Sequence, residues 1–261
     1  MSPQPPRALL FDVFGTCVDW RTTVTNALIK ESKTPSSDVP DGTRKRLSSM
    51  TSEDWGAFAQ EWRNTYMHFV QSIARDSSIP WKSVDQHHYD ALGELLEKWS
   101  ITGLWNDEER LSMSLIWHKL DPWDDSVEGM KLLNTKFTTC TLSNGNISLL
   151  EDLREHSNIQ FKELFSGELF NSYKPSPKVY LGAVDRLGMK PEECAMVAAH
   201  LKDLEAAKSC GLQTIYVERP QEEGLSPDVA EDYKTNGLVD LWVPGDENGF
   251  IAVAEKLGVS H

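Results

Sequence analysis

Residues 8–16 of the 261-residue chain read ALLFDVFGT, an apolar run that ends in an acid and a glycine. This pattern predicts a buried strand over residues 8–11 and a tight turn that carries Asp12. Similar apolar runs recur at residues 138–142, 195–199, 214–217 and 238–243. Because helical patterns separate most of these runs, the sequence predicts an α/β fold with a doubly wound parallel sheet. Catalytic groups gather at the carboxyl ends of the strands in such sheets.

The long segment between the first two predicted strands carries helical rather than strand patterns. Aromatic and apolar residues recur at helical spacing over residues 53–76, and Ser52 is the expected N-cap. Two more helical patterns follow at residues 92–99 and 111–120. Eight of the nine tryptophans come before residue 124, so this segment has an aromatic composition of its own. We therefore expect an inserted helical unit with its own core.

These patterns predict two domains. A catalytic core is expected from residues 1–19 and 122–261, and a helical cap from residues 20–121. Two polar stretches that are rich in turn-forming residues are expected to be loops, at residues 32–49 and 221–236.

The charge of the chain limits its partners. The formal net charge is −14, from 26 basic and 40 acidic residues. Such a protein repels phosphate backbones and anionic lipid head groups, so nucleic acid and membranes are not expected partners. A small anionic substrate would also be repelled at long range. A site for one must therefore supply local positive charge from lysine or arginine.

The cysteines and the apolar segments indicate a cytoplasmic protein. No apolar stretch reaches 18 residues, and the N-terminus lacks the pattern of a signal peptide. The four cysteines are scattered and show no metal-type pairing: Cys17, Cys140, Cys194 and Cys210. We expect reduced, structural thiols.

Four short segments carry residues that could perform chemistry. Asp12 ends the first predicted strand, and Ser143-Asn144-Gly145 ends the second. Lys174 precedes a proline, and Asp203 follows the third apolar run. Each has an ordinary structural explanation when taken alone: Asp12 suits a turn, and Asp203 suits the N-cap of a helix over residues 204–210.

Taken together and in this order, the four segments resemble the haloacid dehalogenase superfamily, and the resemblance covers the whole chain. It implies a Rossmann-like core with an inserted cap and a nucleophilic Asp12. Two departures argue against the phosphatases of that superfamily. Phe14 stands where they carry a second acid, and Ala198-Ala199 stands where they carry Gly-Asp. A phosphate ester needs a proton donor and Mg²⁺, and this site is one carboxylate short, so no metal and no cofactor are expected.

The chain resembles the L-2-haloacid dehalogenase branch in particular. The residues that carry this resemblance are the Asp12 loop, the Trp62-Arg63 pair, Ser143-Asn144-Gly145, and Lys174-Pro175 followed by Val179-Tyr180. A halide leaves without a proton, and attack on carbon needs no metal clamp. The resemblance implies hydrolysis of short 2-haloacids to 2-hydroxyacids through an ester on Asp12.

The resemblance also implies roles for the other residues. Lys174 keeps Asp12 ionised, and Asp203 activates the hydrolytic water. Arg63 binds the substrate carboxylate or the halide. The remaining expected site residues are Thr16, which holds the Asp12 loop, Ser143 and Asn144, which bind the substrate carboxylate, Tyr180, which supports Lys174 or the pocket, and Phe14, which contacts the substrate. The branch also commonly forms homodimers.

His200 departs from the branch, which has an amide at this position and a hydroxyl at Ala198. We expect His200 to orient the hydrolytic water as a neutral imidazole. Two other roles stay open, namely a contact to the departing halide and a purely structural loop histidine. Two other functions also stay open: a magnesium-dependent phosphatase of the same fold, and a non-catalytic binding protein.

Overall fold

A computed structural model describes residues 5–35, 38–76, 78–223 and 226–259, so the ends of the predicted core domain lie partly outside the described residues. Six strands form one sheet in the order β3-β2-β1-β4-β5-β6, and every pairing is parallel. Their bounds are Ala8–Phe11 (β1), Thr138–Ser143 (β2), Glu163–Ser166 (β3), Cys194–Ala198 (β4), Gln213–Val217 (β5) and Leu241–Val243 (β6). The predicted doubly wound parallel fold is confirmed.

Alternate residues of β1 point to opposite faces of the sheet. Leu9 and Phe11 pack in one core, and Ala8 and Leu10 pack in the other. The helices of the first face are α6 (Ser126–Leu133), α7 (Ile147–Ser157) and α11 (Gly249–Lys256), and those of the second are α8 (Pro177–Leu187) and α9 (Leu201–Ser209). Because β1 pairs with both β2 and β4, Asp12 emerges at the middle of the carboxyl edge.

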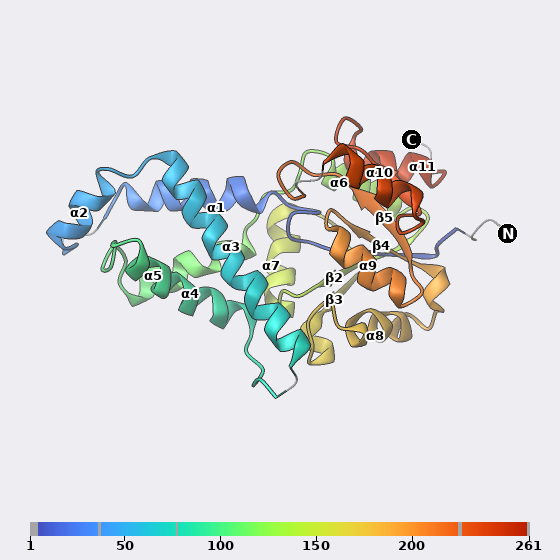
Figure 1. Cartoon of the computed structure of the whole chain (residues 1–261), viewed down its shortest axis with the longest axis horizontal. Helices are drawn as coiled ribbons and strands as arrows, with labels where there is room; N and C mark the ends of the chain where they lie inside the picture. The colour runs from blue at the N-terminus through green and yellow to red at the C-terminus, as the bar shows by residue number, and fades with distance from the viewer. Residues whose placement is uncertain (1–4, 36–37, 77, 224–225, 260–261) are drawn as a thin grey trace.

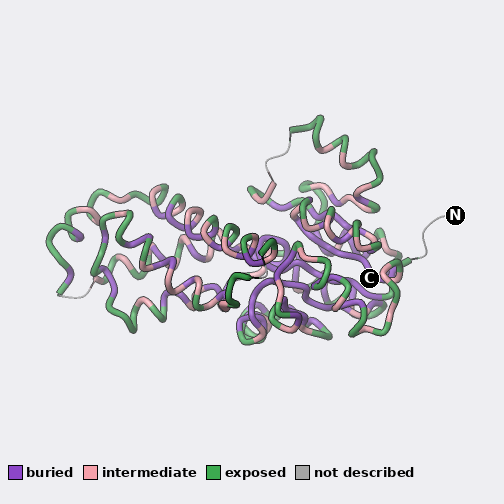
Figure 2. The backbone as a smooth tube through the Cα atoms, turned by 60° about the horizontal axis from the view of Figure 1, so that its bottom comes forward, coloured by how far each residue is buried: buried purple, intermediate pink, exposed green. Residues whose placement is uncertain are grey.

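The chain between β1 and β2 begins with a helical segment that lies beside the sheet (Figure 1). Its elements are α1 (Trp20–Ser32), α2 (Asp41–Leu47), α3 (Ser52–Arg75), α4 (Val84–Lys98), α5 (Asp107–Ser114) and the 3₁₀ turn η1 (Leu115–His118). We call residues 20–118 the helical insertion. Its buried positions face inward, and exposed positions cover its outside (Figure 2). Trp20, Trp55 and Trp62 are buried in the core.

Four details differ from the sequence-based expectations. Strand β3 was not expected, because its four residues form a short edge with an exposed Glu163. Both stretches expected to be loops contain a polar helix, α2 in the first and α10 (Pro227–Thr235) in the second. The N-cap of α3 is Thr51 rather than Ser52, since Thr51 and Asp54 form a reciprocal capping box.

Three short 3₁₀ turns complete the described elements: η1, η2 (Gly167–Phe170) and η3 (Pro191–Glu193). Among the residues described, no helix is long and apolar enough to cross a bilayer.

Candidate active site

Asp12 lies at the carboxyl end of β1, and its two carboxylate oxygens have different partners. Oδ1 accepts a hydrogen bond from Lys174 Nζ at 2.9 Å. Oδ2 accepts one from the Thr16 hydroxyl at 2.8 Å and faces His200 Nδ1 at 2.9 Å. Burial alone would raise the pKa of Asp12, but Lys174 and His200 outweigh it and hold that pKa well below its usual range. The carboxylate is therefore ionised at neutral pH.

The loop after Asp12 is fixed by Thr16 and Arg219. The Thr16 hydroxyl accepts the backbone N–H of Ala199 at 2.9 Å, so its own proton points to Asp12 Oδ2. Arg219 Nε donates to the Thr16 carbonyl at 3.0 Å, and its Nη2 donates to Asp125 at 2.9 Å. This buried, bidentate pair anchors the nucleophile loop to the core.

Lys174 lies between two carboxylates. Its Nζ is 2.9 Å from Asp12 Oδ1 and 2.5 Å from Asp203 Oδ2. Burial would lower the pKa of Lys174, but the two acids raise it above the usual lysine value, so the ammonium is charged. The side-chain amide of Asn144 holds the lysine backbone at two points, accepting from Lys174 N at 2.7 Å and donating to its carbonyl at 3.2 Å. Asn144 therefore positions Lys174.

Asp203 lies at the start of α9, where it contacts Lys174 and Tyr180. The Tyr180 hydroxyl donates to Asp203 Oδ1 at 2.5 Å. Burial raises the pKa of Asp203, and the charge of Asp12 raises it further. Lys174 lowers this pKa but does not outweigh the other two effects. Tyr180 contacts this acid directly and not the lysine. An acid with a raised pKa close to an ionised one is suited to taking up a proton.

His200 joins Asp12 to a second acid. Its Nδ1 lies 2.9 Å from Asp12 Oδ2, and its Nε2 lies 3.0 Å from Glu222 Oε2. Burial would lower the pKa of His200, but the two carboxylates raise it to about 10. Both ring nitrogens therefore carry protons at neutral pH. This arrangement favours an imidazolium over the neutral, water-orienting imidazole expected from the sequence.

Arg63 reaches the site from α3 and is buried. Its guanidinium carbon lies 4.6 Å from the Tyr66 ring centre, 5.4 Å from that of Phe14 and 5.6 Å from that of Trp20. Phe14 of the Asp12 loop is buried and lies against Tyr66, which belongs to α3 like Arg63. The two ring centres are 6.1 Å apart. The helical insertion thus supplies a positive charge held by aromatic faces, beside the nucleophile loop.

Ser143 is fully buried at the end of β2. Its Oγ accepts the backbone N–H of Gly145 at 3.1 Å, which leaves the hydroxyl proton free to donate. The predicted site residues therefore meet at the carboxyl edge of the sheet. They come from the ends of β1, β2 and β4, from the segment that leads into α8, and from helices α8 and α9. They are Asp12, Thr16, Ser143, Asn144, Lys174, Tyr180, His200 and Asp203, with Arg63 and Phe14 at the boundary to the helical insertion.

The donor set does not fit the magnesium ion that phosphatases of this superfamily use. Asp12 and Asp203 both already bind Lys174 Nζ, and the third carboxylate nearby, Glu222, pairs with His200. The side chain at position 14 is a hydrocarbon ring, and Ala199 offers no side-chain oxygen. Over the described part of the chain, no group of three His, Cys, Asp or Glu residues could hold a metal ion.

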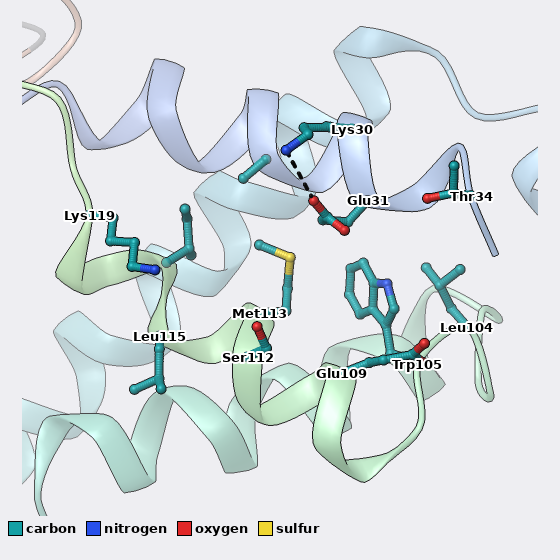
Figure 3. A pocket seen from close by; sticks show the side chains of 12 residues that line it. Lys30, Glu31, Thr34, Leu104, Trp105, Glu109, Ser112, Met113, Leu115 and Lys119 are labelled. Carbon is teal, nitrogen blue, oxygen red and sulfur yellow. Dashed lines mark ion pairs between the residues drawn. The ribbon is translucent and has the colours of Figure 1, made fainter. Parts of the chain in front are cut away.

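A hollow elsewhere in the molecule is separate from this chemistry. A cavity of about 360 Å³ lies in the helical insertion between α1, α5 and η1, where Trp105 and Met113 point into it (Figure 3). Lys30, Glu31 and Glu109 line its rim. None of the predicted site residues lines this cavity, so we assign it no part in the site.

Sequence reasoning missed two residues of this cluster, Glu222 and Arg219. Both follow β5, a strand next to β4, so their position after a predicted strand was a usable signal. Three acids follow that strand closely, however: Glu218, Glu222 and Glu223. Only the fold shows that Glu222 is the one that reaches His200.

Comparisons with known proteins show which family this chain belongs to. The family model of the haloacid dehalogenase-like hydrolases matches residues 6–211. The chain is 28% identical over 229 residues to (S)-2-haloacid dehalogenase 1 of Pseudomonas sp. (strain CBS-3), which covers 85% of this chain and 90% of that protein. Two crystal structures are similar, each with a TM-score of 0.78 and 30% identity. One is a defluorinating L-2-haloacid dehalogenase, and the match covers 97% of this chain and 95% of that one. The other is an L-2-haloacid dehalogenase, and the match covers 98% of this chain and 100% of that one.

Proposed function

Because the chain belongs to the haloacid dehalogenase-like hydrolases, we propose that it is a hydrolytic dehalogenase that converts short 2-haloacids to 2-hydroxyacids. The observation that carries this proposal is the ionised Asp12 carboxylate held between Lys174 and His200, with Phe14 in place of a second acid. A carbon–halogen bond can be broken by such a nucleophile without acid assistance, whereas a phosphate ester cannot.

In the first step, Asp12 Oδ1 attacks C2 of the haloacid from the side opposite the halogen. A new C2–Oδ1 bond forms, the carbon–halogen bond breaks, and the halide leaves with the bonding electron pair. Arg63 of the helical insertion, which we propose acts as the cap, binds the substrate carboxylate or the departing halide. Its charge is the local attraction that a protein with a formal net charge of −14 must provide. The Ser143 hydroxyl donates to the substrate carboxylate.

In the second step, water hydrolyses the aspartyl ester. Asp203 takes a proton from the water, which attacks Cγ of Asp12. Oδ2 takes the negative charge, and the Thr16 hydroxyl and His200 Nδ1–H donate to it. The Cγ–Oδ1 bond then breaks. Oδ1 leaves as the hydroxyl of the product after accepting a proton from Lys174, which recovers one from Asp203. The second water proton remains on the new Asp12 carboxyl and is released to solvent, which regenerates the carboxylate.

A product-release assay tests this function. Purified protein in EDTA is given chloroacetate, bromoacetate, fluoroacetate, (S)-2-chloropropionate and, separately, a small phosphate ester. We expect halide from at least one acid and no phosphate. Phosphate release that appears only with Mg²⁺, with no halide from any acid, would establish the phosphatase instead. A protein that releases neither would be a binding protein.

A further inference from the structure

Glu222 is a buried acid beside the catalytic residues. It follows β5, and its side chain is only 6% exposed. One carboxylate oxygen, Oε2, lies 3.0 Å from His200 Nε2, and the other, Oε1, accepts the indole N–H of Trp20 at 2.8 Å. Trp20 begins α1 of the helical insertion. Both oxygens of Glu222 therefore have partners, one in the catalytic loop and one in the insertion.

The nucleophile loop leaves room for this carboxylate. Gly15 has a φ of +84°, and a Cβ on it would come within 2.3 Å of Glu222 Oε2. Only glycine satisfies both requirements at this position. The neighbours of Glu222 are also held, since Arg21 donates to the Gln221 carbonyl at 3.3 Å and Glu223 accepts the Leu201 N–H at 2.9 Å. The position of Glu222 is therefore fixed from several sides.

A buried carboxylate needs a charged or hydrogen-bonding partner. Burial would raise the pKa of Glu222, but His200 lowers it below the usual value, and the charge of Arg63 adds to this effect. Glu222 is thus an anion, and it favours the cationic form of the imidazole. The charged groups around this pair are Asp12, Arg63 and, on the far side of Asp12, Lys174 and Asp203.

The reaction gives this second carboxylate a specific use. In the free enzyme, Asp12 itself favours a charged His200. Once Asp12 has become an ester, that negative charge is gone, although its carbonyl oxygen must now accept charge during hydrolysis. Glu222 is the other carboxylate in contact with His200, and it keeps its charge throughout the cycle. A cationic donor at the ester oxygen therefore depends on Glu222.

We propose that Glu222 is a positioning residue that holds His200 as an imidazolium, with its Nδ1–H directed to Oδ2 of the aspartyl ester, so that this oxygen is stabilised when water attacks Cγ. The proposal rests on the dehalogenase function above. It predicts that loss of the Glu222 charge slows ester hydrolysis, the step in which the His200 cation is needed. Alkylation should be spared, because a cation beside Asp12 makes it a weaker nucleophile in that first step.

The kinetic test compares Glu222→Gln with Glu223→Gln. Both substitutions remove one charge from the same loop, but only the first removes the acid from His200. Single-turnover halide release measures alkylation, and the mass of the intact protein follows the alkylated intermediate. For Glu222→Gln we expect hydrolysis to slow about 100-fold, as for loss of an oxyanion donor, with alkylation within about 3-fold of wild type. The Glu223→Gln variant should match wild type in both steps.

NMR of the His200 ring provides a readout that does not depend on turnover, with its signals assigned by their loss in His200→Gln. In wild type the imidazolium should persist above pH 8, and Glu222→Gln should bring its titration down by more than one pH unit. Glu222→Asp, which keeps the charge, should retain the cation and recover most of the hydrolysis rate.

Two results would overturn the role of Glu222: an unchanged His200 titration in Glu222→Gln, or equal slowing of both steps, as a displaced loop would cause. If wild type releases no halide from any haloacid, the dehalogenase function fails. The NMR titration would then still decide whether Glu222 controls the charge of His200.

Discussion

At the scale of single residues, the asymmetry of the Asp12 carboxylate is the feature from which the mechanism follows. Oδ1 accepts a hydrogen bond from the Lys174 ammonium, whereas Oδ2 lies against a hydroxyl and an imidazole. Lys174 can approach the attacking oxygen without blocking the opposite side of the carboxylate. Donors on Oδ2 are already in position for the charge that develops there in the second step. Each oxygen therefore has a separate chemical task.

Replacing the nucleophile should abolish turnover but not folding. Asp12→Asn puts an amide, which is a far poorer nucleophile, in nearly the same space. We expect halide release to fall by at least about 10³-fold with an unchanged circular dichroism spectrum. Asp19→Asn is the matched control, because Asp19 caps α1 and asparagine caps helices equally well. Turnover in Asp12→Asn within 10-fold of wild type would contradict the role of Asp12.

Thr16 combines a structural and a chemical contact. Thr16→Val leaves the buried Ala199 N–H without an acceptor, which should cost about 1–3 kcal/mol in the free energy of unfolding. It also removes a donor from Oδ2, so hydrolysis of the ester should slow by about 100-fold. Thr16→Ser keeps the hydroxyl and should therefore retain both the stability and the rate of ester hydrolysis. Urea unfolding and single-turnover kinetics measure the two effects, and a Val variant with wild-type values in both would refute the assignment.

At the scale of secondary-structure elements, the buried strands were predictable because parallel strands covered on both faces form apolar runs. The short edge strand β3 was not, since Glu163 is exposed and Leu164 is only partly buried. Helices α2 and α10 bury almost none of their residues, and their polar sequences, which are rich in turn-forming residues, resemble loops. The motif residues were identifiable from their order along the chain. Glu222 was not, because Glu218 and Glu223 follow the same strand, and only the fold shows which acid reaches His200.

The helical insertion and the core are joined by His118 of η1. Its ring lies 3.0 Å from Asp85 of α4 and 2.7 Å from Asp152 of α7. Burial would lower the pKa of His118, but the two acids raise it. The stabilisation from this cation is complete below the pKa of free histidine, about 6.5, and is lost as the pH rises through the raised value.

Substitution of this histidine should therefore be most costly in acid. We expect His118→Gln to lower the free energy of unfolding by about 1–2 kcal/mol at pH 6, a figure reduced because Asp152 is largely exposed, and by less at pH 9. His156→Gln is the control, because His156 pairs with Asp121 on the surface and should contribute little at either pH. Urea unfolding at the two pH values checks this. A larger loss at pH 9 would contradict the assigned pairing.

At the scale of the whole molecule, the insertion lies beside the carboxyl edge of the sheet and supplies part of the site (Figure 1). Phe14 of the nucleophile loop contacts Tyr66 and Trp117 of the insertion, and the Tyr173 hydroxyl donates to the Lys82 carbonyl at 2.8 Å. In the proposed mechanism, the core supplies the nucleophile from the end of β1 and the base from α9, and the insertion supplies Arg63. Arg63 thus places a positive charge beside the Asp12 loop in a protein whose overall charge would repel an anionic substrate.

The covalent ester on Asp12 can be tested directly by oxygen labelling of the whole protein. Enzyme in excess over (S)-2-chloropropionate completes a single turnover in ¹⁸O-labelled water and is then digested and analysed by mass spectrometry. Because water attacks Cγ, the peptide that contains Asp12 should gain about 2 Da, and the 2-hydroxyacid should carry no label. Label in the product of this first turnover, with an unlabelled Asp12 peptide, would mean that water attacks carbon directly and would contradict the mechanism.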